Sequence, residues 1–505
     1  MNLQGALLVG LAATTVPSSG LSQPAPPSTW CNPLPLPDYP VGRFARTVTN
    51  GDPLDQSPLW LLDHKEQYRE LADPSMMVHE GVWYLYPSCD MAWVSRDHGA
   101  TWQHAPITIE GEGTYRDVGY APTVERHGDR FLLVASDSPL YEASSPLGPF
   151  KSLGKIALPV DPEIPPPVDP MLYSDRDARL YYYWGCTATN GIWGVELDAK
   201  HPTKPLGAPQ KLIAPDTKKF PWEALGEWNQ NPAVSWMEGA WMFRHGDTYY
   251  LTYSAAGTEN KTYAIGCYTA KSPLGPFVAQ RKNPIVRSTT GLITGTGHGS
   301  VFQDSAGQIW CVYTVRAGVA HGFERRIGMD RAEIDAHGEL FVPEVTSFPQ
   351  GVSGHPAATG WVPLNDSLRT TVSSSAPNLP GRFAVDDSLR TWWQPDTQDS
   401  APTLALALIP GSTLRAVRII WRDLGLNTLK GVNPGPFRYH VDVETAPGQW
   451  QTVVDQTHNE TDLLIDYREC APVSGSQIRL VVTGWPKGIT PGVVQFTPFG
   501  TSAGH

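Results

Sequence analysis

Thr248-Tyr249-Tyr250-Leu251-Thr252-Tyr253 is a run of β-branched, aromatic and aliphatic residues that follows the turn residues Gly246 and Asp247. These residue types suit a pleated β-strand, and the run lacks the apolar spacing of a helix. Upstream lies Met237-Glu238-Gly239, a short segment that places a polar residue ahead of the strand. This unit, a polar segment followed by a strand-like run, decides the fold because the chain repeats it.

Four other runs have the same character, and each follows a polar turn: Val82–Tyr86, Arg130–Val134, Leu180–Trp184 and Gln308–Tyr313. Each is preceded by a short polar or proline-containing segment: Asp73-Pro74, Tyr120-Ala121-Pro122, Val168-Asp169-Pro170 and Gly297-His298-Gly299. The turn Ser145–Phe150 of one unit is repeated as Ser272–Phe277 in another. Five units at intervals of roughly 45 to 70 residues predict a five-bladed β-propeller, which we place at residues 23–355.

From near Trp361 the repeated units give way to alternating strands such as Thr403–Leu408 and Ala416–Trp421. Residues 356–505 are long enough for a β-sandwich of jelly-roll type. The segment Phe383–Trp393 resembles a discoidin, or coagulation-factor C-type, domain, whose relatives often bind galactose-type sugars. We therefore expect an all-β protein with a C-terminal accessory domain that is either a carbohydrate-binding module or a packing domain without a ligand.

The composition restricts the possible partners. The chain has 505 residues, a formal net charge of −12 and no run rich in Lys and Arg, so it lacks the electrostatic footprint of a nucleic-acid-binding protein. A neutral ligand such as a sugar is compatible with this charge. The six cysteines are widely spaced without a CxxC pair, which argues against a zinc cluster and leaves disulfide pairing open.

Residues 1–22 resemble a signal peptide, with the apolar run Ala6–Ala13 followed by small residues up to Ser22, although no Lys or Arg precedes the run. The run is too short to span a bilayer, and no other stretch has eighteen or more apolar residues. We expect a secreted or periplasmic protein that is not inserted in a membrane.

Three acidic residues, Asp73, Asp169 and Glu238, occupy the polar segments of units one, three and four. Inverting hydrolysis of a glycoside needs one carboxylic acid to protonate the leaving oxygen and one carboxylate to activate water, roughly 6.5 to 9.5 Å apart. A third carboxylate beside the acid can raise its pKa by repulsion between like charges. Because the inner strands of a propeller converge on its axis, we predict that these three side chains are catalytic and face one pocket.

Over roughly residues 31–350 the chain resembles family 43 of the glycoside hydrolases, in the segments around the three acids, in Cys31–Leu34, in the repeated Ser-Pro-Leu-Gly-Pro-Phe turn and in Phe323–Arg326. The resemblance implies an inverting exo-glycosidase. It implies that Asp73 is the general base, that Glu238 is the general acid, and that Asp169 modulates the pKa and the orientation of the acid.

His298 resembles the family's histidine near the propeller axis, which in some members meets a calcium or sodium ion through water; a core histidine is the alternative. No other cofactor is expected. Glu223 and Glu227, in the loop that enters unit four, are rivals of Glu238 for the role of acid.

Several residues are predicted to contact the substrate. Trp93, Trp222 and Trp241 are candidate platforms for stacking a sugar ring, with burial between blades as the alternative. Glu223 is a candidate for binding a sugar hydroxyl, and His298 is included in the substrate-binding set. Arg325 or Arg326 either donates to sugar hydroxyls or holds a catalytic carboxylate, with plain structural pairing as the alternative.

The favoured substrate is an α-L-arabinofuranoside at the end of an oligosaccharide or polysaccharide, with a β-D-xyloside or a β-D-galactofuranoside as further possibilities. Two alternatives stay open. One is a carbohydrate-binding propeller without catalytic activity. The other is a retaining hydrolase of sialidase type, because Ser95–Trp102 matches the Asp-box turn of sialidase propellers; with a single copy, we interpret the turn as structural.

Overall fold

The computed structural model describes residues 28–42, 67–88, 91–110, 113–114 and 120–502. In these ranges the regular elements are strands and three short 3-10 helices: η1 (Pro221–Glu223), η2 (Gly381–Ala384) and η3 (Thr428–Lys430). The predicted all-β class is therefore confirmed. None of the helices in this part of the chain is long and apolar enough for a membrane crossing. The predicted signal peptide lies outside the described residues.

Five four-stranded antiparallel sheets form the first unit, each with its strands in sequence order. Blade 1 contains β2 (Ser75–His79), β3 (Val82–Tyr86), β4 (Met91–Ser95) and β5 (Gln103–Pro106). Blade 2 contains β8 (Thr123–His127), β9 (Arg130–Val134), β10 (Leu140–Ala143) and β11 (Lys151–Gly154). Blade 3 contains β12 (Met171–Ser174), β13 (Leu180–Trp184), β14 (Ile192–Leu197) and β15 (Gln210–Ile213).

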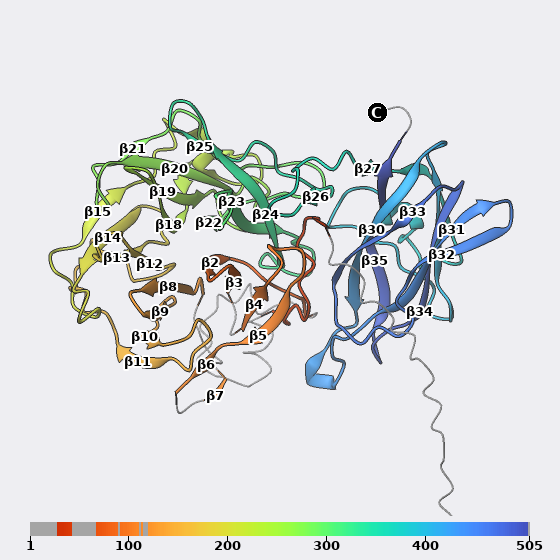
Figure 1. Ribbon diagram of the computed structural model, residues 1–505, viewed down its shortest axis with the longest axis horizontal. Coiled ribbons are helices and arrows are strands. Elements are labelled where there is room, and N and C mark those ends of the chain that lie inside the picture. The colour runs from red at the N-terminus through yellow and green to blue at the C-terminus, as the bar shows by residue number, and fades with distance from the viewer. Residues whose placement is uncertain (1–27, 43–66, 89–90, 111–112, 115–119, 503–505) are drawn as a thin grey trace, which may run out of the picture.

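Blade 4 contains β18 (Met237–His245), β19 (Thr248–Ala255), β20 (Ala264–Ala270) and β21 (Val278–Ala279), and blade 5 contains β22 (Gly299–Gln303), β23 (Ile309–Arg316), β24 (Arg325–Ile334) and β25 (Leu340–Phe341). The first strands β2, β8, β12, β18 and β22 contact one another in a ring, from which the sheets radiate (Figure 1). The predicted five-bladed β-propeller is confirmed.

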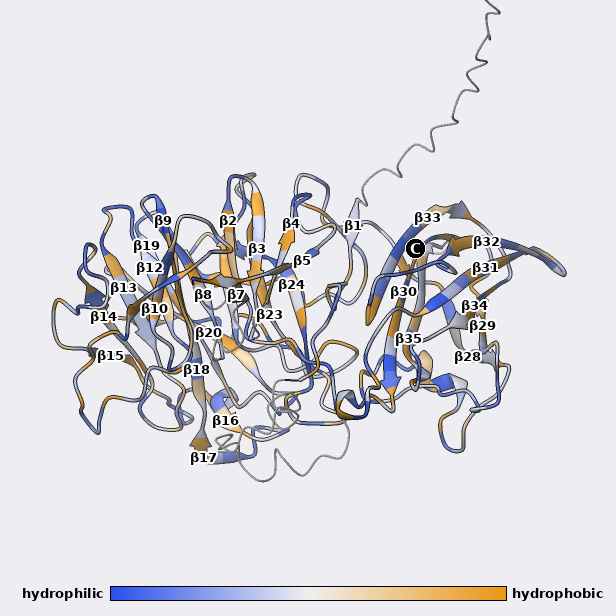
Figure 2. Cartoon of the chain, turned by 90° about the horizontal axis from the view of Figure 1, so that it is seen from below, coloured by the Kyte–Doolittle hydropathy of each residue, from blue (hydrophilic) through white to orange (hydrophobic). Residues whose placement is uncertain are grey.

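Short strand pairs connect the blades. β6 (Thr108–Ile109) pairs with β7 (Gly113–Thr114) after blade 1, and β16 (Ala224–Leu225) pairs with β17 (Asn231–Ser235) before blade 4. β1 (Thr29–Trp30) pairs with β26 (Gln350–Gly351), which ties the start of the propeller to its end. Figure 2 shows β16 and β17 at the edge of the propeller, next to β18.

The second strand of each blade reads as a continuous apolar run because neighbouring blades cover both of its faces. All five residues of β13 are buried. Trp83 of β3 and Trp310 of β23 are fully buried and meet edge to face, with ring centroids 5.6 Å apart. Strands covered on both faces need no polar alternation, so the aromatic runs of the sequence become the contacts between blades.

Two antiparallel sheets form the second unit. One contains β27 (Val362–Pro363), β30 (Thr413–Leu424), β33 (Ile465–Val473) and β35 (Thr490–Thr501). The other contains β28 (Asn365–Val372), β29 (Thr403–Leu408), β31 (Arg438–Ala446), β32 (Gln449–Asp455) and β34 (Gln477–Gly484). Leu406 and Leu480 of the second sheet share a hydrophobic core with Ile419 and Phe496 of the first. The discoidin-like character of this unit stays a prediction.

Buried charged groups join the two units. Arg69, just before blade 1, forms ion pairs with Asp423, at 2.6 Å, and with Asp462. Arg418 of β30 donates to the carbonyl oxygens of Asn32 and Ser347, both at 2.6 Å. The second unit is therefore docked on the propeller through contacts that are out of reach of water.

The Asp-box stretch forms the turn between β4 and β5. Ser95 Oγ accepts the backbone N–H of Gly99 at 2.8 Å, and Asp97 Oδ1 accepts that of Thr101 at 2.9 Å. These bonds hold a turn, in line with the structural interpretation. The described cysteines, Cys31, Cys186, Cys267, Cys311 and Cys470, are all free thiols; Cys89 lies outside the described residues.

Candidate active site

The predicted catalytic residues lie where the inner strands of the blades begin. Asp73 precedes β2, Asp169 precedes β12 and His298 precedes β22, whereas Glu238 is the second residue of β18. Asp73, Asp169 and His298 have positive φ angles of 51°, 51° and 30°. Such angles are uncommon for residues with a side chain and cluster at functional sites. The blade starts therefore hold a strained backbone that directs side chains toward the axis.

Hydroxyl groups of the adjacent blade fix these strained positions. Each accepts a backbone N–H at a blade start: Thr314 Oγ1 from Asp73 at 2.9 Å, Ser88 Oγ from Ala121 at 2.8 Å, Ser136 Oγ from Asp169 at 2.9 Å and Ser254 Oγ from His298 at 2.7 Å. Because a buried N–H without an acceptor is costly, these four bonds lock the blade starts in place.

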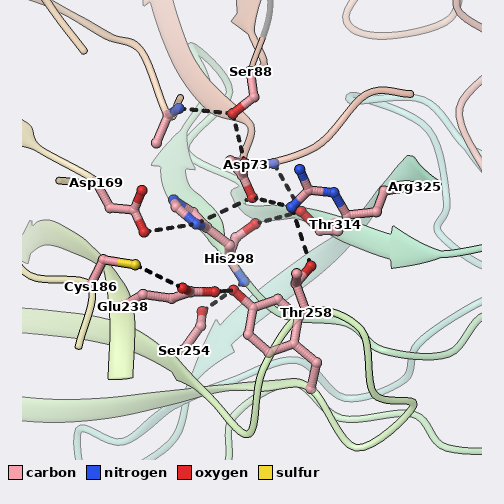
Figure 3. Close-up of polar contacts among 12 residues, drawn as sticks. Asp73, Ser88, Asp169, Cys186, Glu238, Ser254, Thr258, His298, Thr314 and Arg325 are labelled. Atoms are coloured by element: carbon pink, nitrogen blue, oxygen red, sulfur yellow. Dashed lines mark hydrogen bonds and ion pairs between the residues drawn. The ribbon is translucent and has the colours of Figure 1, made fainter. Parts of the chain in front are cut away.

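His298 lies between the carboxylates of two blades (Figure 3). Its Nδ1 is 3.3 Å from Asp73 Oδ1 and 3.7 Å from Asp169 Oδ2. Its ring packs against Gly239, where a Cβ atom would lie only 2.9 Å from the imidazole. His298 thus lies beside two of the acids that the sequence predicted to converge, and these carboxylates are its ion-pair partners.

Asp73 is in an environment that keeps it ionised. Burial alone would raise its pKa, but Arg325, His298 and a hydrogen bond from Ser88 together hold the pKa below its usual value. Arg325 Nη1 is 3.1 Å from Oδ1, and Ser88 Oγ donates to Oδ2 at 2.6 Å. A buried carboxylate that stays charged at neutral pH can accept a proton from water.

Asp169 is in the opposite environment. Burial raises its pKa to about 7, and the negative charges of Glu238 and Asp73 add to this rise while His298 opposes it. One oxygen of Asp169 lies within 4.8 Å of an oxygen of Glu238. The pKa values of Asp73 and Asp169 are therefore shifted in opposite directions.

Three donors hold the carboxyl group of Glu238. Trp236 Nε1 donates to Oε2 at 2.7 Å, and Cys186 Sγ donates to the same oxygen at 3.2 Å. The hydroxyl of Tyr263 donates to Oε1. These three bonds fix the orientation of the Glu238 side chain, and one of its donors, Trp236, is itself 39% exposed.

Arg325 is placed to hold carboxylates. The side chain is buried, and Nη2 lies 2.5 Å from Glu70 Oε1 while Nη1 pairs with Asp73. Nη1 also donates to Thr258 Oγ1 at 3.2 Å. Of the predicted roles, the structure supports the one in which Arg325 holds a carboxylate, that of Asp73.

The three tryptophans predicted to stack on sugars are buried between strands. Trp93 has no exposed surface and donates from Nε1 to the carbonyl of Pro37 at 2.7 Å. Trp241 is 8% exposed and donates to the carbonyl of Val301, and Trp222 is 7% exposed and packs on Tyr253. A ring covered on both faces has no face for a sugar, so the alternative of burial between blades holds for all three.

Glu223 is also buried. It is 0% exposed, its Oε1 accepts the Tyr253 hydroxyl at 2.5 Å and its Oε2 accepts the backbone N–H of Asp216 at 2.7 Å. The predicted contact with a sugar hydroxyl is therefore corrected to a structural role. Glu227, the other rival acid, pairs with Arg316 at 2.7 Å.

Sequence reasoning missed Cys186, Trp236, Tyr263, Ser88 and Glu70, which contact the acids or Arg325. Trp236 offered a signal, because it stands two residues before Glu238. The other four residues belong to no local motif, and only the fold brings them to the acids or to Arg325.

A metal ion does not fit the three acids and histidine directly. Asp169, Glu238 and His298 offer ligand atoms within 4.8 Å of one another. Calcium prefers about six to eight oxygen ligands, whereas this group supplies two carboxylates and one imidazole. No reaction step is therefore assigned to a metal, and an ion reached from His298 through water stays a prediction.

Comparisons with known proteins agree with this geometry. The model of the family "Glycosyl hydrolases family 43" matches residues 67–340. A β-D-galactofuranosidase of Aspergillus niger is 29% identical over 188 residues, which are 37% of this chain and 48% of that protein. A β-xylosidase of Xylanibacter ruminicola is 27% identical over 272 residues, 44% of this chain and 82% of its own.

Solved structures include similar chains. The crystal structure of a thermostable family-43 glycoside hydrolase is 25% identical, covers 57% of this chain and 97% of its own, and has a TM-score of 0.46. The present chain spans about half of the length of the Aspergillus relative.

Proposed function

Because the chain belongs to family 43 of the glycosyl hydrolases, it is a glycosidase, and we propose that it removes a terminal sugar from an oligosaccharide or polysaccharide with inversion at the anomeric carbon. Asp73 takes a proton from the attacking water. Glu238 gives its proton to the glycosidic oxygen as the bond from that oxygen to the anomeric carbon breaks. Asp169 orients and modulates Glu238.

The observation that carries this proposal is the contrast between the carboxyl groups. The pKa of Asp73 is held below its usual value by Arg325, His298 and Ser88 against the effect of burial, as a base requires. Burial raises the pKa of Asp169 to about 7. Environments that separate the ionisation of neighbouring carboxyl groups are typical of acid–base sites. Asp73 has the environment of the base, and Asp169, with an oxygen within 4.8 Å of one of Glu238, is placed to act on the acid.

The sugar that we favour is an α-L-arabinofuranoside, with a β-D-xyloside or a β-D-galactofuranoside as further candidates. The names of the relatives support this set. They include a β-D-galactofuranosidase, a β-xylosidase and a xylosidase/arabinosidase of Bacteroides ovatus.

Hydrolysis of the three corresponding aryl glycosides tests the reaction and the sugar. We expect the fastest turnover on the α-L-arabinofuranoside, and a loss of roughly a hundredfold or more in the Asp73→Asn and Glu238→Gln variants. NMR of the first-formed anomer should show inversion. A retained anomer would contradict the role of Asp73 and revive the retaining, sialidase-type alternative.

In place of the three buried tryptophans, we propose Trp236 as the aromatic contact of the leaving group. Its indole N–H holds Glu238 Oε2, and its ring is 39% exposed. The Trp236→Phe variant should keep the ring and lose the bond, whereas Trp236→Ala should also raise KM for an oligosaccharide. Equal KM values for all three proteins would argue against the contact.

An ion near His298 also remains a proposal. If calcium reached through water supports the site, chelation followed by gel filtration should lower the activity, and added calcium should restore it. Unchanged activity of protein shown to be metal-free by elemental analysis would count against the ion.

For the C-terminal unit we propose a galactose-type ligand, supported by the resemblance of Phe383–Trp393 to a discoidin domain. Calorimetric titration of the full chain with galactose checks this proposal. We also propose that the protein is secreted or periplasmic. N-terminal sequencing of the exported protein should then begin near residue 23.

A further inference from the structure

The join between blades 3 and 4 differs from the other four joins. Elsewhere a hydroxyl of one blade accepts the N–H of the next blade start. Here Thr187 and Met237 exchange two backbone hydrogen bonds, at 3.0 and 2.9 Å. The side chain that precedes Thr187 is therefore not needed for the join, and this side chain is the thiol of Cys186.

The thiol of Cys186 is turned toward Glu238 instead (Figure 3). Its sulfur lies 3.2 Å from Oε2, the oxygen that also receives the indole N–H of Trp236 at 2.7 Å. Burial, together with the charges of Asp169 and Glu238, raises the pKa of this thiol well above its usual value. The sulfur therefore keeps its proton and remains a donor.

We propose that Cys186 is a positioning residue for the general acid, and that its weak S–H donor holds Glu238 Oε2 without competing strongly with the proton that Glu238 must deliver. This proposal rests on the proposed role of Glu238.

The chemistry of sulfur gives the reason for a thiol at this place. An indole N–H can only donate, so Trp236 permanently occupies one lone pair of Oε2. A hydroxyl at position 186 would add a second strong donor, which would stabilise the ionised carboxylate over the acid. An S–H group is a weak donor that can rotate away. It keeps the carboxyl group in place and still leaves a lone pair for the catalytic proton.

The leaving-group dependence of hydrolysis tests this role. A dinitrophenyl glycoside leaves without protonation, whereas an alkyl glycoside needs the full help of the acid. In Cys186→Ala, kcat/KM on the alkyl glycoside should fall roughly threefold to tenfold while the dinitrophenyl glycoside is nearly unaffected. In Cys186→Ser, the hydroxyl should hold Glu238 in place but favour its ionised form, so the basic limb of the pH profile of kcat/KM on the alkyl glycoside should move to lower pH.

The matched control is Cys267→Ala, which removes a buried free thiol of blade 4 that donates to the carbonyl of Tyr268. It should leave the ratio of the two rates unchanged. Equal losses on both glycosides in Cys186→Ala would show a purely structural role and overturn the proposal, as would a basic limb that does not move in Cys186→Ser.

A spectroscopic measurement that needs no turnover tests the contact between Cys186 and Glu238 independently of the proposed substrate. The infrared S–H band that disappears in Cys186→Ala should change its frequency in Glu238→Gln, because the acceptor changes from a carboxyl group to an amide. A band that does not respond to Glu238→Gln overturns the contact. If the wild-type protein cleaves no glycoside of the panel but the band responds, the choice of substrate is wrong and the contact stands.

Discussion

Ser88 acts on Asp73 with one hydroxyl group. Its Oγ accepts the N–H of Ala121 at 2.8 Å and donates to Asp73 Oδ2 at 2.6 Å. The same atom thus joins blade 1 to blade 2 and solvates the carboxylate of Asp73. At the scale of single residues, the charge of Asp73 depends on Arg325, His298 and this hydroxyl against the opposing effect of burial.

The Ser88→Ala variant should raise the pKa of Asp73, because the carboxylate loses a donor that favours its charged form. The acid limb of the pH profile of kcat/KM should therefore move to higher pH, with a loss of roughly tenfold at the plateau. Ser136→Ala is the control, since it also removes an acceptor for an N–H at a blade start. An acid limb that moves equally in both variants would contradict a specific effect on Asp73.

At the scale of elements, the bulge of β18 sets the position of both Glu238 and His298. The pairing with β19 shifts register between Glu238 and Trp241, and Gly239 in this bulge has a φ of 64°. Only glycine adopts such an angle freely. The absence of a side chain also lets the imidazole of His298 approach to within a distance that a Cβ atom would forbid.

Gly239→Ala should lower the activity more than the stability. The positive φ costs about 1–2 kcal/mol, and the added methyl group would meet the His298 ring at 2.9 Å and displace it from Asp73. Gly246→Ala is the matched control, because Gly246 has a φ of 59° in the same hairpin and open space around it. Denaturant unfolding should show similar destabilisation of both variants, and kcat should fall only in Gly239→Ala. Equal kcat values in the two variants would show that the bulge does not position the site.

The sequence predicted the elements well where a residue pattern is compatible with only one structural role. Aromatic runs such as Leu180–Trp184 became middle strands, and the acids before β2 and β12 converged as the repeat required. It failed where two explanations share a residue type. A tryptophan can stack on a sugar or fill a core, and Trp93 fills a core. The burial of Glu223 depends on Tyr253, which is distant in sequence and adjacent only in the fold.

Blade 5 contains a buried acid outside the active site. Asp330 of β24 accepts from the Tyr313 hydroxyl at 2.5 Å and from Thr346 Oγ1 at 2.6 Å. Burial raises its pKa to about 7, against the hydrogen bonds that lower it. The folded protein therefore keeps a proton that the unfolded chain loses above about pH 4.

The sign of the pH effect follows from this difference. Between about pH 4 and the raised pKa near 7, the native state binds the extra proton, so the free energy of unfolding falls as the pH rises. In Asp330→Asn, this contribution should vanish, and the stability measured by urea unfolding at pH 5 and pH 8 should differ less than in the wild-type protein. An unchanged difference would show that Asp330 does not titrate in this range.

At the scale of the whole molecule, two consecutive residues connect the docking of the second unit to the active site. Arg69 forms buried ion pairs with Asp423 and Asp462 of the C-terminal unit. Glu70 pairs with Arg325, which in turn holds Asp73. The segment just before blade 1 is therefore shared between the interface of the units and the contacts of Asp73, so we expect the two units to act as one body.

The Arg69→Met variant should lower the free energy of unfolding by about 3–5 kcal/mol, because two buried carboxylates lose their partner. Burial already raises the pKa of Asp462 to about 6, with Arg69 opposing. Without Arg69 this group protonates more readily, so the loss should be smaller at pH 5 than at pH 8. Arg130→Met is the control, since its pair with Glu142 is partly exposed and worth at most about 1 kcal/mol. A single unfolding transition with a lowered kcat in Arg69→Met would show that Arg69 links the docking of the C-terminal unit to Asp73 through Glu70. An unchanged kcat would show that Glu70 holds Arg325 without help from the C-terminal unit.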